Sequence, residues 1–209
     1  GAILNTIAGP IYVGHQAEIM EGSLVRGGMA LCDNATLKMG SKVYGACSIG
    51  PHCKVGGEIN NVIFQSYSNK GHDGFLGNSI IGEWCNLGAD TNTSNLKNNY
   101  SNVKTYSYKS KTEIKTDLQF MGLCMGDYSK SGINTMFNTA SVIGVSSNVF
   151  GSGFPAKHIP SFSWVNTLDI VSFDLDKAII SANNMMTRRN LELNQIDKDI
   201  FSHLSSTKI

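Results

Sequence analysis

An aliphatic residue returns at every sixth position near the start of the chain, and this period limits the folds that the sequence can adopt. Eight successive positions keep it without a miss: Val13, Ile19, Val25, Leu31, Leu37, Val43, Ile49 and Val55. A mostly small residue follows four positions after each of them. Neither a helix, with 3.6 residues per turn, nor a strand, with a repeat of two, has this period. The pattern predicts a solenoid of triangular coils, in which the aliphatic side chains fill the interior and the small residues occupy tight corners.

The same period returns later in the chain, first in Phe75, Ile81 and Leu87, and then in Met125, Ser131, Phe137, Ile143 and Val149. Two segments break it, residues 60–74 and residues 93–118, and we expect both to be insertions. Solenoids accept insertions as loops on one face, which is often the binding face. Because both segments flank one coil, we expect them to converge on one site. The alternating stretch KTYSYKSKTEIK, at 104–115, predicts an exposed β-hairpin.

After Pro160 the pattern becomes helical. Asp174 is a suitable N-cap, and apolar residues then recur at intervals of three, four or seven positions: Leu175, Ile179, Ala182, Met186, Leu193, Ile196, Ile200 and Leu204. This predicts a C-terminal helix that packs on the solenoid or on a partner chain, with Arg188 and Arg189 on its solvated face. The expected organisation is a solenoid over 1–165 and a helical tail over 166–209.

The composition excludes several classes of protein. The 209 residues have a formal net charge of +1 and no basic run, so nucleic acid is not expected as a partner. No apolar stretch reaches the roughly 18–20 residues that span a bilayer, and no signal peptide opens the chain. We therefore expect a cytoplasmic protein that does not enter membranes. The five cysteines include no CxxC pair, which indicates reduced thiols and no metal site.

A specific motif begins in the stretch KGHDGFLGN, at residues 70–78. From its histidine onward the chain reads His72, Phe75-Leu76-Gly77, Ile81-Gly82, Asn86-Leu87-Gly88-Ala89-Asp90-Thr91 and Ser94-Asn95-Leu96. This order resembles the active-site coil of the hexapeptide-repeat acyltransferases, whose fold is a left-handed parallel β-helix. Within that superfamily it is similar to the acetyltransferase domain of the bifunctional N-acetylglucosamine-1-phosphate uridylyltransferase/glucosamine-1-phosphate acetyltransferases. The motif covers residues 72–96, whereas the hexapeptide pattern extends from Val13 to Pro160.

The resemblance implies an acetyl-CoA-dependent N-acetyltransferase that acts on an amino-sugar phosphate, in UDP-N-acetylglucosamine biosynthesis. It makes His72 the general base, because an amine nucleophile is protonated at neutral pH and must lose a proton before it attacks a thioester. It makes Asn86 and Asn95 ligands of the amino sugar and the acyl group, which an asparagine can bind without adding a charge. Phe75 and Lys70 complete the expected substrate-binding residues.

The resemblance also implies where the acyl donor and the partner chains lie. Ala89 would border the thioester of acetyl-CoA, and the backbone amides around Ser131 and Gly132 would polarise its carbonyl group. The protein would be a homotrimer with its active sites between subunits. A nucleotidyltransferase domain would precede the solenoid, outside this chain.

The motif departs from the family pattern at three places. Leu96 stands where the family has tyrosine, Asp90 stands where it has glycine, and Asn60-Asn61 stands where we would look for a phosphate-binding lysine. Other cations can take that role, and the candidates are Arg26, Lys38, Lys54, Lys70 and Lys97. The sequence therefore leaves the phosphate anchor and the identity of the sugar open.

Three alternatives remain open at this point. The solenoid can be a non-catalytic module that trimerises the protein and binds a regulatory sugar nucleotide. A zinc hydratase on the same fold would need three convergent histidines, but the five histidines show no closely spaced pair. The lysines of the segment 93–118 can either steer anionic ligands or simply keep an exposed hairpin from aggregating.

Overall fold

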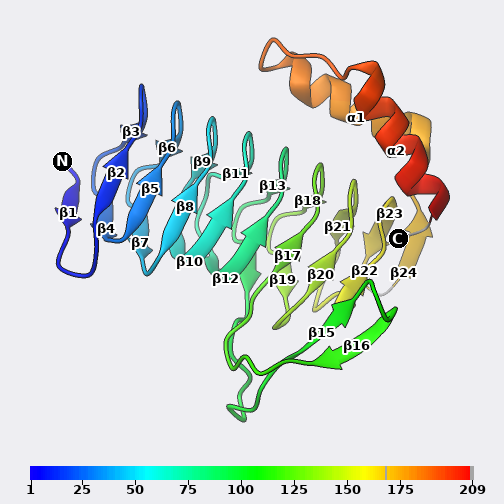
Figure 1. Ribbon diagram of the computed structural model, residues 1–209, viewed down its shortest axis with the longest axis horizontal. Helices are drawn as coiled ribbons and strands as arrows, with labels where there is room; N and C mark the ends of the chain where they lie inside the picture. The colour runs from blue at the N-terminus through cyan, green and yellow to red at the C-terminus, as the bar shows by residue number, and fades with distance from the viewer. Residues whose placement is uncertain (168, 208–209) are drawn as a thin grey trace.

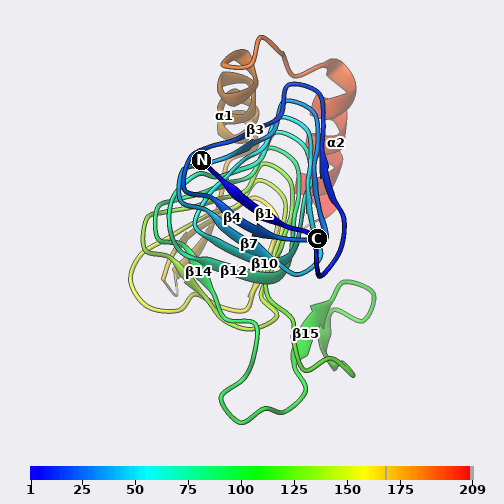
Figure 2. The same ribbon diagram turned by 90° about the vertical axis from the view of Figure 1, so that its left-hand side faces the viewer.

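The computed structural model describes residues 1–167 and 169–207. Its main body is a parallel β-solenoid of about nine turns, followed by two helices (Figure 1). This confirms the solenoid that the six-residue period predicts. Figure 2 views the solenoid along its axis, so the coils lie one behind another. The helices lie on one side of the stack and a hairpin lies on the opposite side.

The coils contribute short strands to three faces, and the first face ends at β19 while the other two continue. The first face is formed by β1 (Ile3–Asn5), β4 (Leu24–Arg26), β7 (Lys42–Tyr44), the first halves of β10 (Glu58–Phe64) and β12 (Phe75–Ile81), β14 (Asn92–Thr93) and β19 (Met136–Phe137). The second face is formed by β2 (Ile11–Val13), β5 (Met29–Leu31), β8 (Cys47–Ile49), the second halves of β10 and β12, β17 (Cys124–Met125), β20 (Val142–Ile143) and β22 (His158–Ile159).

The third face carries the site described below. Its strands, in stacking order, are β3 (Glu18–Ile19), β6 (Thr36–Leu37), β9 (Lys54–Val55), β11 (Asn69–Lys70), β13 (Asn86–Leu87), β18 (Lys130–Ser131), β21 (Asn148–Phe150), β23 (Ser163–Asn166) and β24 (Asp169–Ser172). All neighbouring pairs are parallel except the last, in which β24 returns antiparallel to β23.

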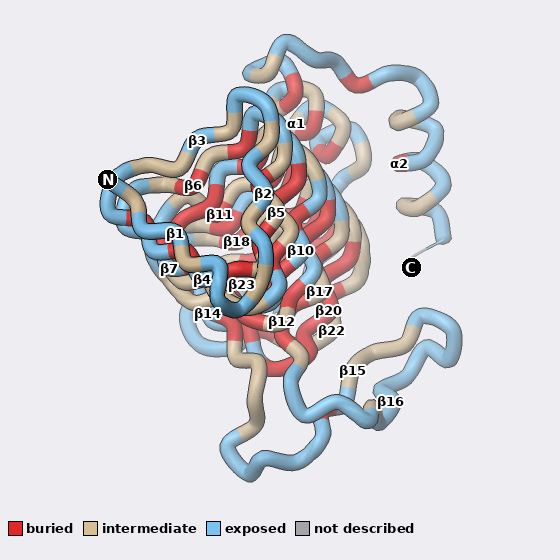
Figure 3. Tube along the Cα trace, turned by 60° about the vertical axis from the view of Figure 1, so that its left-hand side comes forward, coloured by how far each residue is buried: buried red, intermediate tan, exposed pale blue. Residues whose placement is uncertain are grey.

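The interior of the coils is filled as the period predicts. The six aliphatic residues of the series from Val25 to Val55 are all buried and belong to one continuous core. Figure 3 shows buried positions recurring at the same place in successive coils. Val13 is exposed, because it lies in the first coils, where the stack continues on one side only.

The structure corrects the prediction for residues 60–74. This segment is not an insertion, because β10, β11 and β12 all stay in the stack. The coil is shortened instead: two residues, Gly56-Gly57, join the third face to the first, where residues 38–41 do so in the preceding coil. The six-residue spacing is also lost within β10 and β12, where the inward residues Ile59 and Phe64, and then Leu76 and Ile81, are five residues apart, so Leu76 rather than Phe75 is the inward residue of β12.

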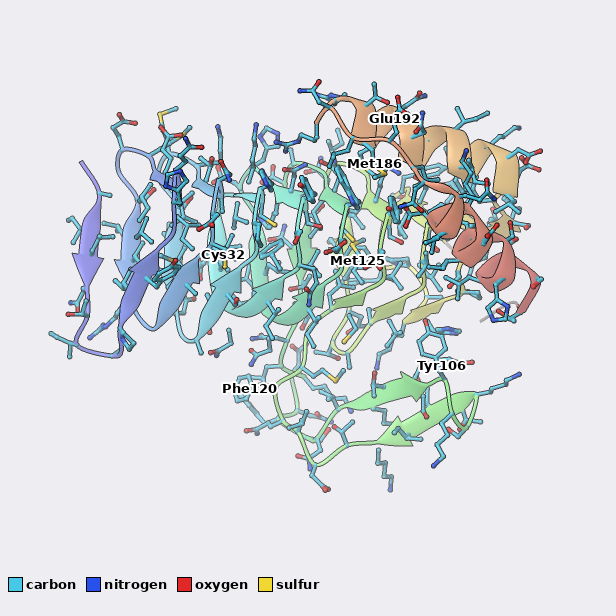
Figure 4. All side chains as sticks on the ribbon, turned by 45° about the horizontal axis from the view of Figure 1, so that its top comes forward. Cys32, Tyr106, Phe120, Met125, Met186 and Glu192 are labelled. Carbon is cyan, nitrogen blue, oxygen red and sulfur yellow. The ribbon has the colours of Figure 1, made fainter. Side chains whose placement is uncertain are left out.

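The segment 93–118 does leave the coils. It contains the predicted antiparallel hairpin, formed by β15 (Lys104–Ser107) and β16 (Thr112–Lys115). The hairpin folds onto the last coils of the second face, where the ring of Tyr106 stacks on that of His158 with 3.4 Å between their centroids. Figure 4 shows Tyr106 pointing from the hairpin towards the solenoid. The expectation that the segments 60–74 and 93–118 converge on one site is therefore wrong.

The tail has two helices where the apolar spacing suggests one. The Asp174 carboxylate caps α1 (Leu175–Thr187) by accepting a hydrogen bond from the first turn, as predicted. The chain then turns through Asn190, whose φ of 57° is incompatible with a continuing helix. Asn194 caps α2 (Gln195–Thr207) in the same way as Asp174 caps α1.

The helices are held by a second apolar cluster outside the coils. Met186 of α1 and Phe201 of α2 are buried there with Trp84 and Phe162 of the solenoid. Figure 4 shows Met186 at the boundary between α1 and the coils. This packing brings the end of α1 over the middle coils. The five cysteine thiols are all free.

Candidate active site

His72 lies at the corner between β11 and β12, where the chain passes from the third face to the first. Its side chain is exposed. The corner is tightly packed, since a Cβ on Gly57 would lie 2.9 Å from the His72 carbonyl oxygen and one on Gly74 would overlap the carbonyl of Thr91. Both glycines also have positive φ, 76° and 109°. The two glycines therefore allow the close corner that presents the imidazole outward.

A cleft of about 580 Å³ opens beside His72 on the third face. His72, Asn86 and Ala89 line it together, so three of the predicted site residues meet there. The opposite side is formed by the end of α1, including Met185. In Figure 1 the connection between the two helices curves back over the middle coils.

A second cleft of about 340 Å³ lies on the other side of His72. It shares His72 and Ala89 with the first cleft, and it adds the carboxylates of Asp73 and Asp90. The imidazole therefore stands between two clefts of different charge.

Stacked aromatic rings form one wall of the larger cleft. Tyr67 and Trp84 are one coil apart, and their rings are parallel with 4.2 Å between centroids. His52 extends the stack by one coil, at 4.6 Å from Tyr67. All three residues occupy the same left-handed corner position, with φ between 57° and 60°. The sequence contains this signal, because Tyr67 and Trp84 recur one coil apart, but neither residue belongs to the motif at 72–96 as an expected site residue.

Four cationic side chains line the larger cleft, and no aspartate or glutamate does: Lys38, Lys54, Arg188 and Arg189. In the described part of the chain the one ion pair is that of Lys42 with Glu58, at 3.9 Å, so none of the four is paired with a carboxylate. Unpaired cations in a cleft favour an anionic ligand. The solvated face predicted for Arg188 and Arg189 is thus also a wall of the cleft.

The floor of the larger cleft is formed by asparagines. Asn69 and Asn86 are register partners on β11 and β13, and both border the cleft. The Asn69 Oδ1 atom is buried without a hydrogen-bond partner among the described residues. Buried carbonyl oxygens are nearly always hydrogen-bonded, so this oxygen is an exception beneath the floor of the cleft.

Phe75 and Asn95 lie on the first face, outside the two clefts. The Asn95 Nδ2 atom donates to the Asn78 Oδ1 atom at 2.7 Å. Gly77 separates the two predicted residues, because a Cβ there would lie 2.8 Å from Asn95 Nδ2 and would also meet the ring of Phe75. Phe75 and Asn95 are therefore neighbours of each other, around the corner from the cleft that contains Asn86.

The structure corrects the expected role of Ser131 and Gly132. Ser131 is buried inside the coil, where its Oγ atom is 2.8 Å from the Oγ1 atom of Thr91. The amide of Gly132 donates to the Val149 carbonyl at 2.7 Å. Because the Gly132 amide already has a partner within the solenoid, it is not free to polarise a thioester in this chain, and the Ser131 hydroxyl faces the core.

The structure also corrects the expected role of Lys70. Its side chain is 0% exposed and points into the coil, so it does not reach a ligand in either cleft. Burial lowers its pKa to about 8, against the opposing influence of the carboxylates of Asp73 and Asp90.

Within residues 1–167 and 169–207, no group of three or more His, Cys, Asp or Glu side chains is arranged to hold a metal ion. None of the helices described in the structure is long and apolar enough to cross a membrane.

The chain is weakly homologous to proteins described as bifunctional protein GlmU. It is 28% identical to that of Trichodesmium erythraeum over 137 residues, which cover 65% of this chain and 25% of the relative. It is 29% identical to that of Methanocaldococcus jannaschii over 116 residues, which cover 56% of this chain and 28% of the relative. The match thus spans about a quarter of the length of these relatives. No protein-family model matches the chain.

Solved structures that match the chain at low TM-score include two named acyltransferases. One is the polysialic acid-specific acetyltransferase NeuO, with 13% identity, a TM-score of 0.36, and coverage of 82% of this chain and 86% of that one. Another is the UDP-N-acetylglucosamine acyltransferase from Campylobacter jejuni, with 14% identity, a TM-score of 0.29, and coverage of 93% and 77%.

Proposed function

We propose that this chain carries an acyltransferase site of the hexapeptide-repeat type, which transfers an acetyl group from acetyl-CoA to the amine of a phosphorylated amino sugar. The observation that supports this most is the larger cleft, where His72, Asn86 and Ala89 meet four cations that lack a carboxylate partner. The weak homology to GlmU proteins supports the same class of reaction.

His72 serves as general base in this proposal. The imidazole removes a proton from the sugar ammonium group, which frees the nitrogen lone pair to attack the thioester carbonyl carbon. A carbon–nitrogen bond forms and the carbon–sulfur bond breaks. The thiolate of coenzyme A leaves and takes up the proton held by the imidazole, and the second proton that the nitrogen loses as it becomes an amide is released to solvent. No covalent intermediate with the protein is needed, and the exposed corner position of His72 gives a substrate free access to it.

The cations of the larger cleft suit the charge of both substrates, because coenzyme A and a sugar phosphate are anionic. Lys38 and Lys54 lie on the coils before His72, where the sequence had left the phosphate anchor open. Arg188 and Arg189 add planar guanidinium groups, which bind phosphate oxygens in pairs.

The test is a turnover screen of the chain with acetyl-CoA and a panel of amino-sugar phosphates. Release of free coenzyme A thiol is followed together with the mass of the acetylated sugar. We expect turnover with at least one phosphorylated amino sugar and less with its unphosphorylated form. Absence of turnover with every acceptor, at substrate concentrations in the millimolar range, would reject the proposal.

A non-catalytic binding module is the second candidate. The observation in its favour is that the Gly132 amide, expected to polarise the thioester, is already bonded to Val149. Calorimetry separates the candidates: a module that binds sugar nucleotides should bind a UDP-sugar and not acetyl-CoA, whereas the acyltransferase should bind acetyl-CoA.

We further propose that the protein works as a homotrimer in the cytoplasm, where acetyl-CoA is available. The second face leaves a row of apolar side chains open in the coils that the hairpin does not cover, with Tyr12 59%, Ile63 44% and Ile80 49% exposed. Closed cyclic symmetry would bury such faces. Light scattering should give three times the mass of one chain, and a stable monomer at micromolar concentration would contradict this.

A further inference from the structure

Lys70 interrupts an aliphatic ladder inside the third face. Its inward neighbours on this face include Leu37, Val55 and Leu87, each of which is buried. Lys70 takes the position between Val55 and Leu87 and is fully buried as well. An ammonium group in the middle of an apolar stack is costly unless each of its hydrogen atoms finds an acceptor.

The Lys70 ammonium has three acceptors, and all of them are main-chain carbonyls. Its Nζ atom donates to the oxygen of Gly56 at 3.3 Å, of His72 at 3.0 Å and of Asp73 at 3.1 Å. These three bonds match the three donors of a charged lysine. Two of the acceptors belong to the corner that carries the candidate base.

In other coils, a main-chain carbonyl of the corresponding corner accepts a hydrogen bond from a side-chain hydroxyl group. The Oγ atom of Ser41 donates to the Lys38 carbonyl, and the Oγ1 atom of Thr135 donates to the Gly132 carbonyl at 2.9 Å. The corners around Lys70 have Gly57 and Gly74 at the position of these hydroxyl residues. The ammonium therefore replaces the missing hydroxyls, and a Cβ at Gly57 would approach Nζ to 2.8 Å.

We propose that Lys70 is a positioning residue, whose buried ammonium holds the corner 71–74 so that the His72 imidazole faces the cleft. The claim about catalysis rests on the proposed function, in which His72 is the base. The claim that Lys70 holds the corner is independent of the proposed function, because it concerns the backbone alone.

The test substitutes Lys70→Met, because methionine is unbranched, nearly as long and apolar, and fills the ladder without a charge. The matched control is Lys130→Met. Lys130 is a half-buried lysine of the third face that donates to the Tyr128 carbonyl and to the Ser181 hydroxyl of α1, and it does not contact the His72 corner. We expect Lys70→Met to lower kcat about 10-fold or more with KM changed less than about twofold, and Lys130→Met to leave both unchanged.

A second measurement tests the corner without any activity. The Asp90 amide donates to the Asp73 carbonyl at 3.1 Å, and the Asn134 amide makes a comparable bond to Ala89 at 2.8 Å one coil later. In Lys70→Met the hydrogen exchange of the Asp90 amide should accelerate at least about 10-fold, while that of Asn134 stays the same. Unchanged Asp90 exchange in the folded variant would overturn the proposal, whether or not the protein turns over acetyl-CoA.

The wild-type protein provides the same test if Lys70→Met does not fold. With a pKa of about 8, the ammonium loses a proton and one donor as the pH rises through that value. The charged groups around it are Asp73 on its own corner and Asp90 on the next coil, and both favour the charged form. The exchange rate of Asp90 relative to Asn134 should therefore rise between about pH 7 and pH 9. A constant ratio would overturn the proposal.

Discussion

The coils up to Val55 and the coils after it belong to the same stack, but they differ in how regularly they repeat. The earlier coils keep the six-residue period, bury an aliphatic residue on each face and close their corners with serines. The later coils shorten one corner to Gly56-Gly57, bury a lysine and carry exposed polar groups on the third face. The regular coils thus supply Lys38 and Lys54 to the larger cleft, and the later coils supply His72, Asn86 and Ala89.

The largest expected effect comes from breaking the regular coils. Ile49→Ala removes a fully buried side chain from the core and should lower the free energy of unfolding by about 2–5 kcal/mol. Urea denaturation measures the loss. The turnover of the folded fraction should stay within about twofold of wild type, because Ile49 borders neither cleft. A loss below about 1 kcal/mol would show that the core of the early coils does not contribute the expected stability.

Removing the candidate base should lower activity and leave stability unchanged, the reverse of the effect expected for Ile49→Ala. His72→Ala should lower kcat/KM about 10²-fold or more, with unchanged thermal stability, since the side chain is exposed. His15→Ala is the control, because His15 is an exposed histidine of the regular coils. Activity of His72→Ala within about threefold of wild type would remove His72 from the proposed mechanism.

The cationic wall should affect binding rather than chemistry. Replacing both Arg188 and Arg189 by serine should raise the KM of an anionic substrate about 10-fold and flatten its dependence on salt, with kcat nearly unchanged. Arg26→Ser is the control, because Arg26 carries the same charge on the first face, outside both clefts. Equal effects of the control and the double variant would mean that net charge alone matters.

The smallest effect is expected from the hairpin. The sequence left steering and simple solvation as equal alternatives for its lysines, but the hairpin packs on the second face at His158, and its residues line neither cleft. Replacing Lys109, Lys111 and Lys115 by serine should therefore change KM less than about twofold at low salt. A rise of fivefold or more, which salt abolishes, would establish steering.

The candidate site could be predicted only where its residues share one coil. His72, Asn86 and Ala89 follow each other within a single turn, so the motif was enough to bring them together, and the structure places them in one cleft. The motif also assigned Lys70 to the substrate, although its side chain points into the coil. Whether a residue faces in or out depends on the register of the coils, and the short corner at Gly56-Gly57 and the five-residue spacing of Ile59 and Phe64 had shifted it before Lys70.

The sequence by itself determined the coil, the hairpin at 104–115 and the N-cap at Asp174, because each depends on residues that are close together in the chain. Only the tertiary structure decided that α1 ends over the middle coils, with Arg188 and Arg189 lining the same cleft as Lys54. It also decided that the lysine next to the candidate base is buried. These contacts join segments far apart in the sequence or depend on the register between coils, and no local period encodes either.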